Sequence, residues 1–292
     1  MTSSLVDLSQ RADLEWLAEL IGDLRQSSPG VQWLIVGALA RDIHLAYAHG
    51  IRMRRATTDT DVALTIAEWT EFTSLRDALI ERGGFQPHQQ IQHKLVHRSG
   101  RAIDIVPFGG IEDAAGVIAW PPDGAERMNV AGYKEALAAS VELKLPLRQT
   151  VQVVSVAGLI VLKAFAWAER HVSQPGKDAY DLSVLLEHYL EAGNQDRLYA
   201  EHADLLEVED FDFSRAGAHI AGRDVTAFLS STSVDPASLR ARLVAIIEPE
   251  LDPARSTALV EQAGARQPEE FRKHLLAFFS GINEKGGEFS QG

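Results

Sequence analysis

Cysteine is absent from the 292 residues of this sequence, which excludes disulfide bonds and thiolate metal ligands. Long hydrophobic runs are missing as well. The longest apolar stretch, 153–168, is interrupted by Ser155 and Lys163 and is too short to span a bilayer. Residues 1–20 carry acidic side chains and lack the basic-then-apolar order of a secretory signal. These absences predict a cytoplasmic protein with no membrane partner.

Positive charge is also in short supply. The 28 lysines and arginines are outnumbered by 41 acidic residues, so the net charge is -13 at pH 7. Such a chain does not attract a nucleic acid through its overall field. A polyanionic substrate would therefore need a bound metal ion or a local basic patch, for which the run Arg52-Met53-Arg54-Arg55 is the best candidate.

The pattern of the sequence changes near residue 150. Before it, short apolar runs bounded by turn residues predict strands that alternate with helices; after it, the periodicity is helical throughout. We therefore expect an α+β domain over residues 1–150, a helical domain over 151–285 and a disordered tail over 286–292. The expected strands are 31–37, 58–66, 94–97 and 101–108, with the last two forming a hairpin around Ser99-Gly100. The expected helices are 8–27, 38–49, 68–82, 155–171, 178–192, 237–247, 253–264 and 268–283, and 109–132 is expected to be loop with room for one short strand.

Two aspartates lie in alternate positions of the predicted strand 58–66. Side chains two apart on a strand share a face, so Asp59 and Asp61 would point the same way while Val62 and Leu64 face the core. Adjacent carboxylates repel each other unless a cation lies between them, and Mg²⁺ takes oxygen ligands of this kind. The pattern therefore predicts a site for a divalent cation.

A third acid, Asp104, lies between Ile103 and Ile105 in an apolar predicted strand, where a lone charge is costly to bury. Beside Asp59 and Asp61 it would complete a cluster able to hold two metal ions, one activating an attacking hydroxyl and one neutralising a leaving pyrophosphate. An Asp-x-Asp pair by itself is more often part of a turn or a solvated face. The combination of the pair with Asp104, on strands separated by a helix, favours catalysis.

A glycine joins the predicted strand 31–37 to the following helix. The segment from Val36 to Asp42 would let backbone N–H groups approach a phosphate at a helix N-terminus. Gly37, Ala38 and Arg41 are therefore candidate nucleotide-binding residues. A tight strand-to-helix turn without a ligand explains the same residues.

Charged residues in the second half form a further candidate group. Lys163 and Arg170 share one face of the predicted helix 155–171, and Lys163 would either bind a nucleotide phosphate or extend from a packed helix to solvent. Asp178 and Asp181 lie on one side of the next helix, where acids in the first turn also stabilise the helix dipole. An ion pair from Lys163 or Arg170 to Asp178 would join the two helices.

These residues resemble a known pattern. Gly37-Ala38, then Asp59-x-Asp61, then Asp104 on a later strand is similar to the nucleotidyltransferases of the DNA polymerase β type. More narrowly, the chain resembles the AbiEii-type nucleotidyltransferases, which include toxins of toxin–antitoxin pairs. The resemblance covers roughly residues 31 to 190. Its other matches are Gly50 and the basic run before the first aspartates, the Lys163 to Arg170 helix, and the motif Lys177-Asp178-x-x-Asp181-Leu182.

The resemblance implies a polymerase β-like core, with a mixed sheet flanked by helices, followed by a helical domain. It implies transfer of a nucleoside monophosphate from an NTP to an acceptor hydroxyl, on a tRNA 3′ end or a protein, and an antitoxin as a partner. It further implies metal binding (Mg²⁺ or Mn²⁺) by Asp59, Asp61 and Asp104, nucleotide binding by Lys163 and Arg170, and positioning or proton transfer by Asp178. A non-catalytic module that binds a nucleotide or a partner on the same fold is the alternative.

Overall fold

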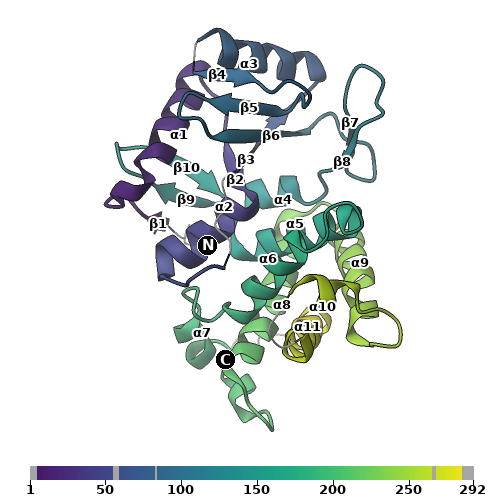
Figure 1. The fold of residues 1–292 in the computed structure, drawn as a ribbon. Coiled ribbons are helices and arrows are strands. Elements are labelled where there is room, and N and C mark those ends of the chain that lie inside the picture. Colours follow the sequence, from purple (N-terminus) through teal and green to yellow (C-terminus); the bar gives the residue numbers. More distant parts are fainter. Residues whose placement is uncertain (1–4, 55–58, 83, 265–267, 285–292) are drawn as a thin grey trace. The chain divides into compact units, whose positions relative to one another are not determined.

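The structure is a computed structural model that describes residues 5–54, 59–82, 84–264 and 268–284 (Figure 1). The chain divides into two compact units, Met1–Leu159 and Ile160–Gly292. No helix in the described ranges is both long enough and apolar enough to cross a membrane. The segment 286–292, for which we expect disorder, lies outside the described residues.

The first unit is built on an eight-stranded mixed sheet with the order β1-β9-β10-β2-β3-β6-β5-β4. The polymerase β-like expectation of a mixed sheet flanked by helices is confirmed. The strands are β1 (Leu5–Asp7), β2 (Leu34–Val36), β3 (Thr60–Ile66), β4 (Phe85–Pro87), β5 (Lys94–His97), β6 (Ala102–Gly109), β9 (Val141–Lys144) and β10 (Thr150–Val153).

The centre of the sheet separates apolar from acidic side chains. β3 runs parallel to β6 and antiparallel to β2, and Val62 pairs with Ile105 in the register of β3 and β6. Both of these side chains are buried. Because side chains alternate along a strand, the neighbouring pair Asp61 and Asp104 points to the opposite face. The alternation predicted from the sequence thus fixes which face of the sheet carries the acids.

Helices α1 (Glu15–Ser27), α2 (Gly37–Asp42), α3 (Trp69–Glu81) and α4 (Tyr133–Ala138) accompany the sheet, and α3 lies alongside β4 in Figure 1. A π-helical turn, Ile43–Tyr47, continues α2. The expected helix 8–27 is wrong at its start: a 3-10 turn covers Ala12–Leu14, and α1 begins only at Glu15. The apolar stripe itself is as predicted, with Leu17, Leu20, Ile21 and Leu24 all buried.

The glycine- and proline-rich stretch 109–132 contains two short strands, where the sequence suggests one. β7 (Val117–Ala119) and β8 (Arg127–Asn129) form a small antiparallel sheet of their own. Asp113 begins this hairpin by accepting the backbone N–H of Val117 at 2.9 Å. Trp120, which follows β7, is buried against Phe72 of α3 and anchors the hairpin.

The second unit is helical, as expected. Its helices are α5 (Val156–Arg170, which begins in the first unit), α6 (Lys177–Glu187), α7 (Gln195–Ala200), α8 (Phe213–Thr232), α9 (Pro236–Ile247), α10 (Ala258–Gln262) and α11 (Pro268–Asn283). α8 and α11 pack closely because glycines face each other between them. A β-carbon on Gly222 would lie 2.2 Å from the carbonyl oxygen of Phe278, and one on Gly281 would lie 2.2 Å from that of His219.

Several elements depart from the sequence-based expectation. The longest described helix, α8, is not predicted, and neither are strands β1, β4, β9 and β10. The expected helix 253–264 is reduced to α10. Before α10 the chain forms a turn, in which Asp252 accepts the backbone N–H groups of Ala254, Arg255 and Ser256, and Glu250 accepts the N–H of Leu259. The expected strand 31–37 shortens to β2, and the strand that carries the aspartates begins at Thr60.

Candidate active site

The central feature of the first unit is the pair Asp61 and Asp104. These residues lie directly opposite each other on the parallel strands β3 and β6. Burial, and after it the negative charge of Asp61, raise the pKa of Asp104 above its ordinary value, although Lys94 and His93 act in the opposite direction. The sequence predicts repulsion between Asp59 and Asp61 on one strand, whereas the structure has it between Asp61 and Asp104 on neighbouring strands.

The two oxygens of the Asp104 carboxylate have different surroundings. Oδ2 lies 3.3 Å from the Nζ of Lys94, which is directly opposite Asp104 on the antiparallel strand β5. Oδ1 is buried and has no hydrogen-bond partner in the described part of the chain. An unsatisfied buried carboxylate oxygen is costly unless a ligand completes it.

Asp59 lies immediately before β3 and is not part of the strand. In the ranges that the structure describes, no three His, Asp or Glu side chains gather closely enough to hold a metal ion. The structure thus brings Asp61 and Asp104 together and does not join Asp59 to them. The three-carboxylate metal site remains a prediction.

The pair of carboxylates nevertheless fits a divalent cation. Asp61 and Asp104 supply oxygen ligands from two rigid strands, and Oδ1 of Asp104 lacks any other partner in the described residues. Mg²⁺ and Mn²⁺ favour such oxygen donors. A bound cation would also offset the repulsion that raises the pKa of Asp104.

Gly37 brings the strand-to-helix turn against this pair. It adopts a positive φ of 67°, and Val36 before it pairs with Asp61 across β2 and β3. A β-carbon on Gly37 would lie 2.0 Å from Oδ2 of Asp61, so a side chain at this position would collide with the carboxylate. The turn at Gly37 and the carboxylate pair are therefore adjacent parts of one candidate site.

The other candidates of this turn are buried. Ala38 is 7% exposed and Arg41 only 2%. The guanidinium of Arg41 donates hydrogen bonds to Oδ1 of Asp42, from Nε at 2.8 Å and from Nη2 at 2.5 Å. The guanidinium of Arg41 is thus paired with a carboxylate of the same turn.

The candidates of the second unit form a buried ion cluster. The Nζ of Lys163 lies 3.1 Å from Asp178 and 2.5 Å from Asp181, and Arg170 donates to Asp178 from Nε at 2.7 Å and from Nη2 at 2.9 Å. The predicted ion pair between α5 and α6 is confirmed for both cations. Only 4% of the Lys163 side chain is exposed, so it does not extend to solvent. Burial alone would raise the pKa of Asp178, but the hydrogen bonds from Arg170 and the charge of Lys163 lower it below its ordinary value.

Two residues beside the carboxylates are not identified from the sequence. Lys94 binds Asp104, and His93, which precedes β5, packs its ring 5.0 Å from the ring of Trp120. Burial lowers the pKa of His93, although Asp104 and Asp61 act to raise it. The predicted hairpin brings residue 94 near residue 104, but a two-residue turn at Ser99-Gly100 would set it opposite Ile105. In the structure His97 is opposite Arg101, and this shift of one residue sets Lys94 opposite Asp104.

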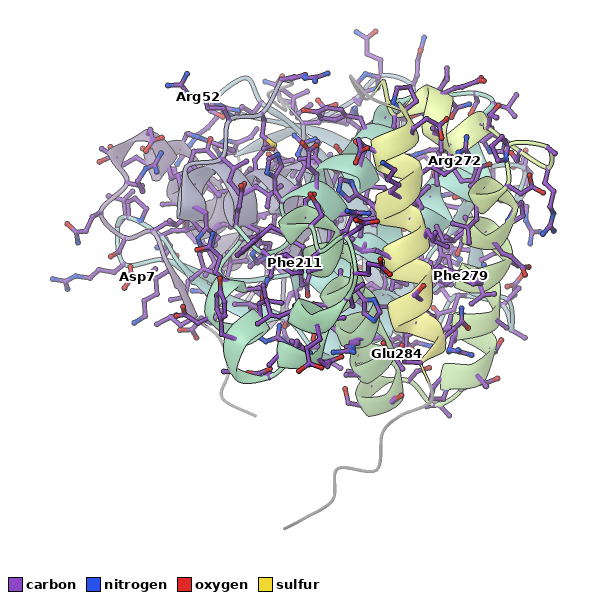
Figure 2. All side chains as sticks on the ribbon, turned by 90° about the horizontal axis from the view of Figure 1, so that it is seen from below. Asp7, Arg52, Phe211, Arg272, Phe279 and Glu284 are labelled. Carbon is purple, nitrogen blue, oxygen red and sulfur yellow. The ribbon has the colours of Figure 1, made fainter. Side chains whose placement is uncertain are left out.

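The basic run is partly described. Arg52 and Arg54 are exposed, and Arg52 extends from the surface in Figure 2. Arg55 lies outside the described residues. The run therefore presents at least these two cations to solvent.

Comparison with known proteins gives one match over most of the chain. The family model described as "Nucleotidyl transferase AbiEii toxin, Type IV TA system" matches residues 20–281. The solution structure of the antibiotic-resistance factor ANT(2'')-Ia is similar at 15% identity and a TM-score of 0.37, covering 66% of this chain and 96% of that chain. No curated protein matches the sequence. On the strength of the family match, which spans both units, the chain belongs to the AbiEii family of nucleotidyltransferases.

Proposed function

We propose that this protein transfers a nucleoside monophosphate from an NTP to an acceptor hydroxyl, and that the transfer depends on a divalent metal ion, Mg²⁺ or Mn²⁺. The observation that carries the proposal is the register of β3 and β6, which sets Asp61 opposite Asp104. We assign metal binding to Asp59, Asp61 and Asp104. When bound, such an ion neutralises charge on the phosphates and makes a coordinated hydroxyl more nucleophilic.

The proton of the acceptor hydroxyl needs a base. Oδ1 of Asp104 is buried without another partner in the described residues, and we assign it the role of proton acceptor. In the proposed step the acceptor oxygen bonds to the α-phosphorus, the bond from that phosphorus to the β-phosphate oxygen breaks, and pyrophosphate leaves. The hydroxyl proton passes to Asp104.

The turn at Gly37 supports nucleotide binding. Because Gly37 has no side chain, the backbone approaches Asp61 closely, and the N–H groups of Gly37 and Ala38 are proposed to contact the triphosphate. Arg41 is buried against Asp42, so its contribution is to hold the turn in place.

The ion cluster of the second unit contains the remaining nucleotide-binding candidates. Lys163 is enclosed by Asp178 and Asp181, whereas one third of the Arg170 side chain is exposed. We assign contact with a nucleotide phosphate to Arg170. Lys163 and Asp178 position Arg170, in place of the direct phosphate contact that the resemblance implies for Lys163.

The experiment that tests this function is incubation of the full chain with Mg²⁺ and each labelled NTP in turn, in the presence of tRNA and in its absence. Label that moves to tRNA identifies a tRNA 3′ end as acceptor, and label on protein identifies a protein hydroxyl. The control is Asp61→Asn, which removes the charge while keeping the shape. If no NTP gives incorporation that depends on Asp61, the enzymatic proposal fails, and nucleotide that is bound but unchanged would indicate the non-catalytic module.

We also propose that the activity is that of a toxin held in check by an antitoxin, in keeping with the description of the family. Expression of the wild-type chain in a bacterial host should arrest growth, and the Asp61→Asn variant at the same level should not. Harmless expression of a chain that transfers nucleotides in vitro would contradict the toxin role and leave the enzymatic one intact.

A further inference from the structure

Lys94 places a positive charge on one of the proposed catalytic carboxylates. Its Nζ lies 3.3 Å from Oδ2 of Asp104, and about one fifth of each side chain is exposed (19% for both). Solvent therefore screens this ion pair only partly. The sequence motifs of the nucleotide-transfer site contain no role for this lysine.

Strand pairing determines the position of Lys94 relative to Asp104. Its position opposite Asp104 is set by the antiparallel register of β5 and β6. The backbone N–H of His97 donates to Arg101 at 2.9 Å on one side, and that of Ile105 donates to His93 at 2.8 Å on the other. The ammonium group thus extends from a paired strand, where its backbone has little freedom to move away.

Lys94 leaves the second oxygen of Asp104 available. Oδ1 is buried without a partner in the described residues and belongs to the carboxylate that faces Asp61. The two oxygens of the Asp104 carboxylate therefore have different roles. One oxygen binds a fixed ammonium group, and the other can bind a metal ion or accept a proton.

The charges of the proposed site show what this division of roles means. Asp61 and Asp104 together carry two negative charges when ionised, and the ammonium group of Lys94 offsets part of this charge. One divalent ion is sufficient to offset the rest, whereas two would overcompensate the pair. A second ion near Oδ2 of Asp104 would also be repelled by the ammonium group already there.

We propose that Lys94 is a built-in cation of the active site that takes the place of one divalent ion, so that the nucleotide-free protein binds a single metal ion. This inference rests on the proposed metal-dependent function. Lys94 is a positioning residue in this scheme: it holds Asp104 by Oδ2 and leaves Oδ1 for the metal ion.

The test is a titration of the nucleotide-free full chain with Mn²⁺, in which bound and free ions are distinguished by electron paramagnetic resonance. The wild-type protein is expected to bind one ion, and Lys94→Met is expected to bind one more. Lys94→Arg keeps the charge and should bind one. Arg98→Met is the matched control, because Arg98 belongs to the same hairpin but pairs with Asp23 at 2.8 Å, away from Asp104, and it should also bind one ion.

The outcomes separate this inference from the function on which it rests. Two ions in the wild-type protein, or the same number in wild-type and Lys94→Met, overturn the role of Lys94 and leave metal-dependent transfer standing. No ion in any of the proteins overturns both. If Lys94→Met fails to fold, Lys94→Gln takes its place in the titration, with the same expected count.

Discussion

The backbone of Gly37 lies against the carboxylate of Asp61, so close that a β-carbon on Gly37 would be 2.0 Å from Oδ2. The contact follows from the sheet, because Val36 and Asp61 are paired across β2 and β3. It joins the turn that begins α2 to the carboxylate pair that we propose to be catalytic. An alanine at this position must either displace Asp61 or shift the turn.

We therefore predict that Gly37→Ala lowers nucleotide transfer by about tenfold to a hundredfold, the range seen when a group that orients a metal ligand is removed. Its positive φ of 67° adds a strain of about 1–2 kcal/mol for any residue with a β-carbon. Transfer rate and thermal unfolding, measured on the same preparation, separate the two effects.

The matched control is Gly50→Ala. Gly50 has a similar φ of 70°, but a β-carbon there would meet nothing within 4 Å. It carries the same backbone strain without the collision, so its stability should fall while its transfer rate is retained. Equal losses of activity in the two variants would show that the contact with Asp61 is not what matters.

Asp104 should limit stability in the metal-free protein. Burial and the charge of Asp61 raise the pKa of Asp104 in the folded state above its value in the unfolded chain. At a pH between these two pKa values, the folded chain holds a proton on Asp104 that the unfolded chain has released. The stability from this carboxyl is consequently lost as the pH rises through that window. We predict that Asp104→Asn raises the midpoint of thermal unfolding at pH 7.5 without metal, while it abolishes transfer.

Asp113→Asn is the control, because the pKa of Asp113 is shifted in the direction opposite to that of Asp104. The hydrogen bond from the backbone N–H of Val117 lowers the pKa of Asp113, so its ionised form is favoured by folding. Loss of that charge should lower the unfolding midpoint slightly and leave transfer unchanged. An Asp104→Asn protein that is less stable than wild type would contradict the account of repulsion between Asp61 and Asp104.

The core of the proposed site could be predicted from the sequence because it depends on local alternation. The two-residue period of β3, and the apolar neighbours of Asp104 in β6, are enough to place Asp61 and Asp104 on the polar face of adjacent strands. Lys94 was not predicted, because a two-residue turn at Ser99-Gly100 would set it opposite Ile105, one residue away from the observed register. The placement of Asp59 was not predicted either, because it depends on where β3 begins, and periodicity does not determine the end of a strand.

The missed elements depend on contacts between distant residues. β9 and β10 are short, and each is completed by pairing with strands far away in the sequence, β1 and β2. α8 contains Gly217 and Gly222, which disfavour a helix locally, yet Gly222 is what permits close packing on α11. Arg41 illustrates the same limit, since its burial against Asp42 could not be inferred from its place in a motif.

Four histidines should make the fold sensitive to mild acid. Burial is the main cause that lowers the pKa of His44, His93, His202 and His274 below the ordinary 6.5. Below pH 6.5 the unfolded chain binds protons that the folded chain does not, so stability is lost as the pH falls from there through the lowered values. We predict a lower unfolding midpoint at pH 5.5 than at pH 7.5.

His44→Gln tests the contribution of one of these histidines. His44 is buried and its Nε2 lies 2.8 Å from the carbonyl oxygen of Val154, a distance that a glutamine N–H can also span. The variant should lose less stability than wild type between pH 7.5 and pH 5.5, because it has no proton to take up on unfolding. An identical loss in both proteins would assign the pH dependence to other groups.

Removing one cation from the ion cluster on α5 and α6 should lower the free energy of unfolding. Lys163→Met leaves Asp178 and Asp181 buried with one cation fewer, and removal of one partner from a buried ion pair typically costs about 3–5 kcal/mol. Arg170→Gln should cost less, about 1.5–3 kcal/mol, because one third of that side chain is already exposed. Denaturant unfolding of each variant measures these free energies.

Two further variants show whether uncompensated charge is the cause. Lys273→Met removes a lysine of the same unit whose ion pair with Glu270 is about half exposed, and it should change stability by less than about 1 kcal/mol. Adding Asp181→Asn to Lys163→Met removes one of the two carboxylates that Lys163 pairs with, so the double variant should recover part of the stability. If the double variant is no more stable than Lys163→Met, the loss comes from packing of the lysine side chain along α5 and not from uncompensated charge.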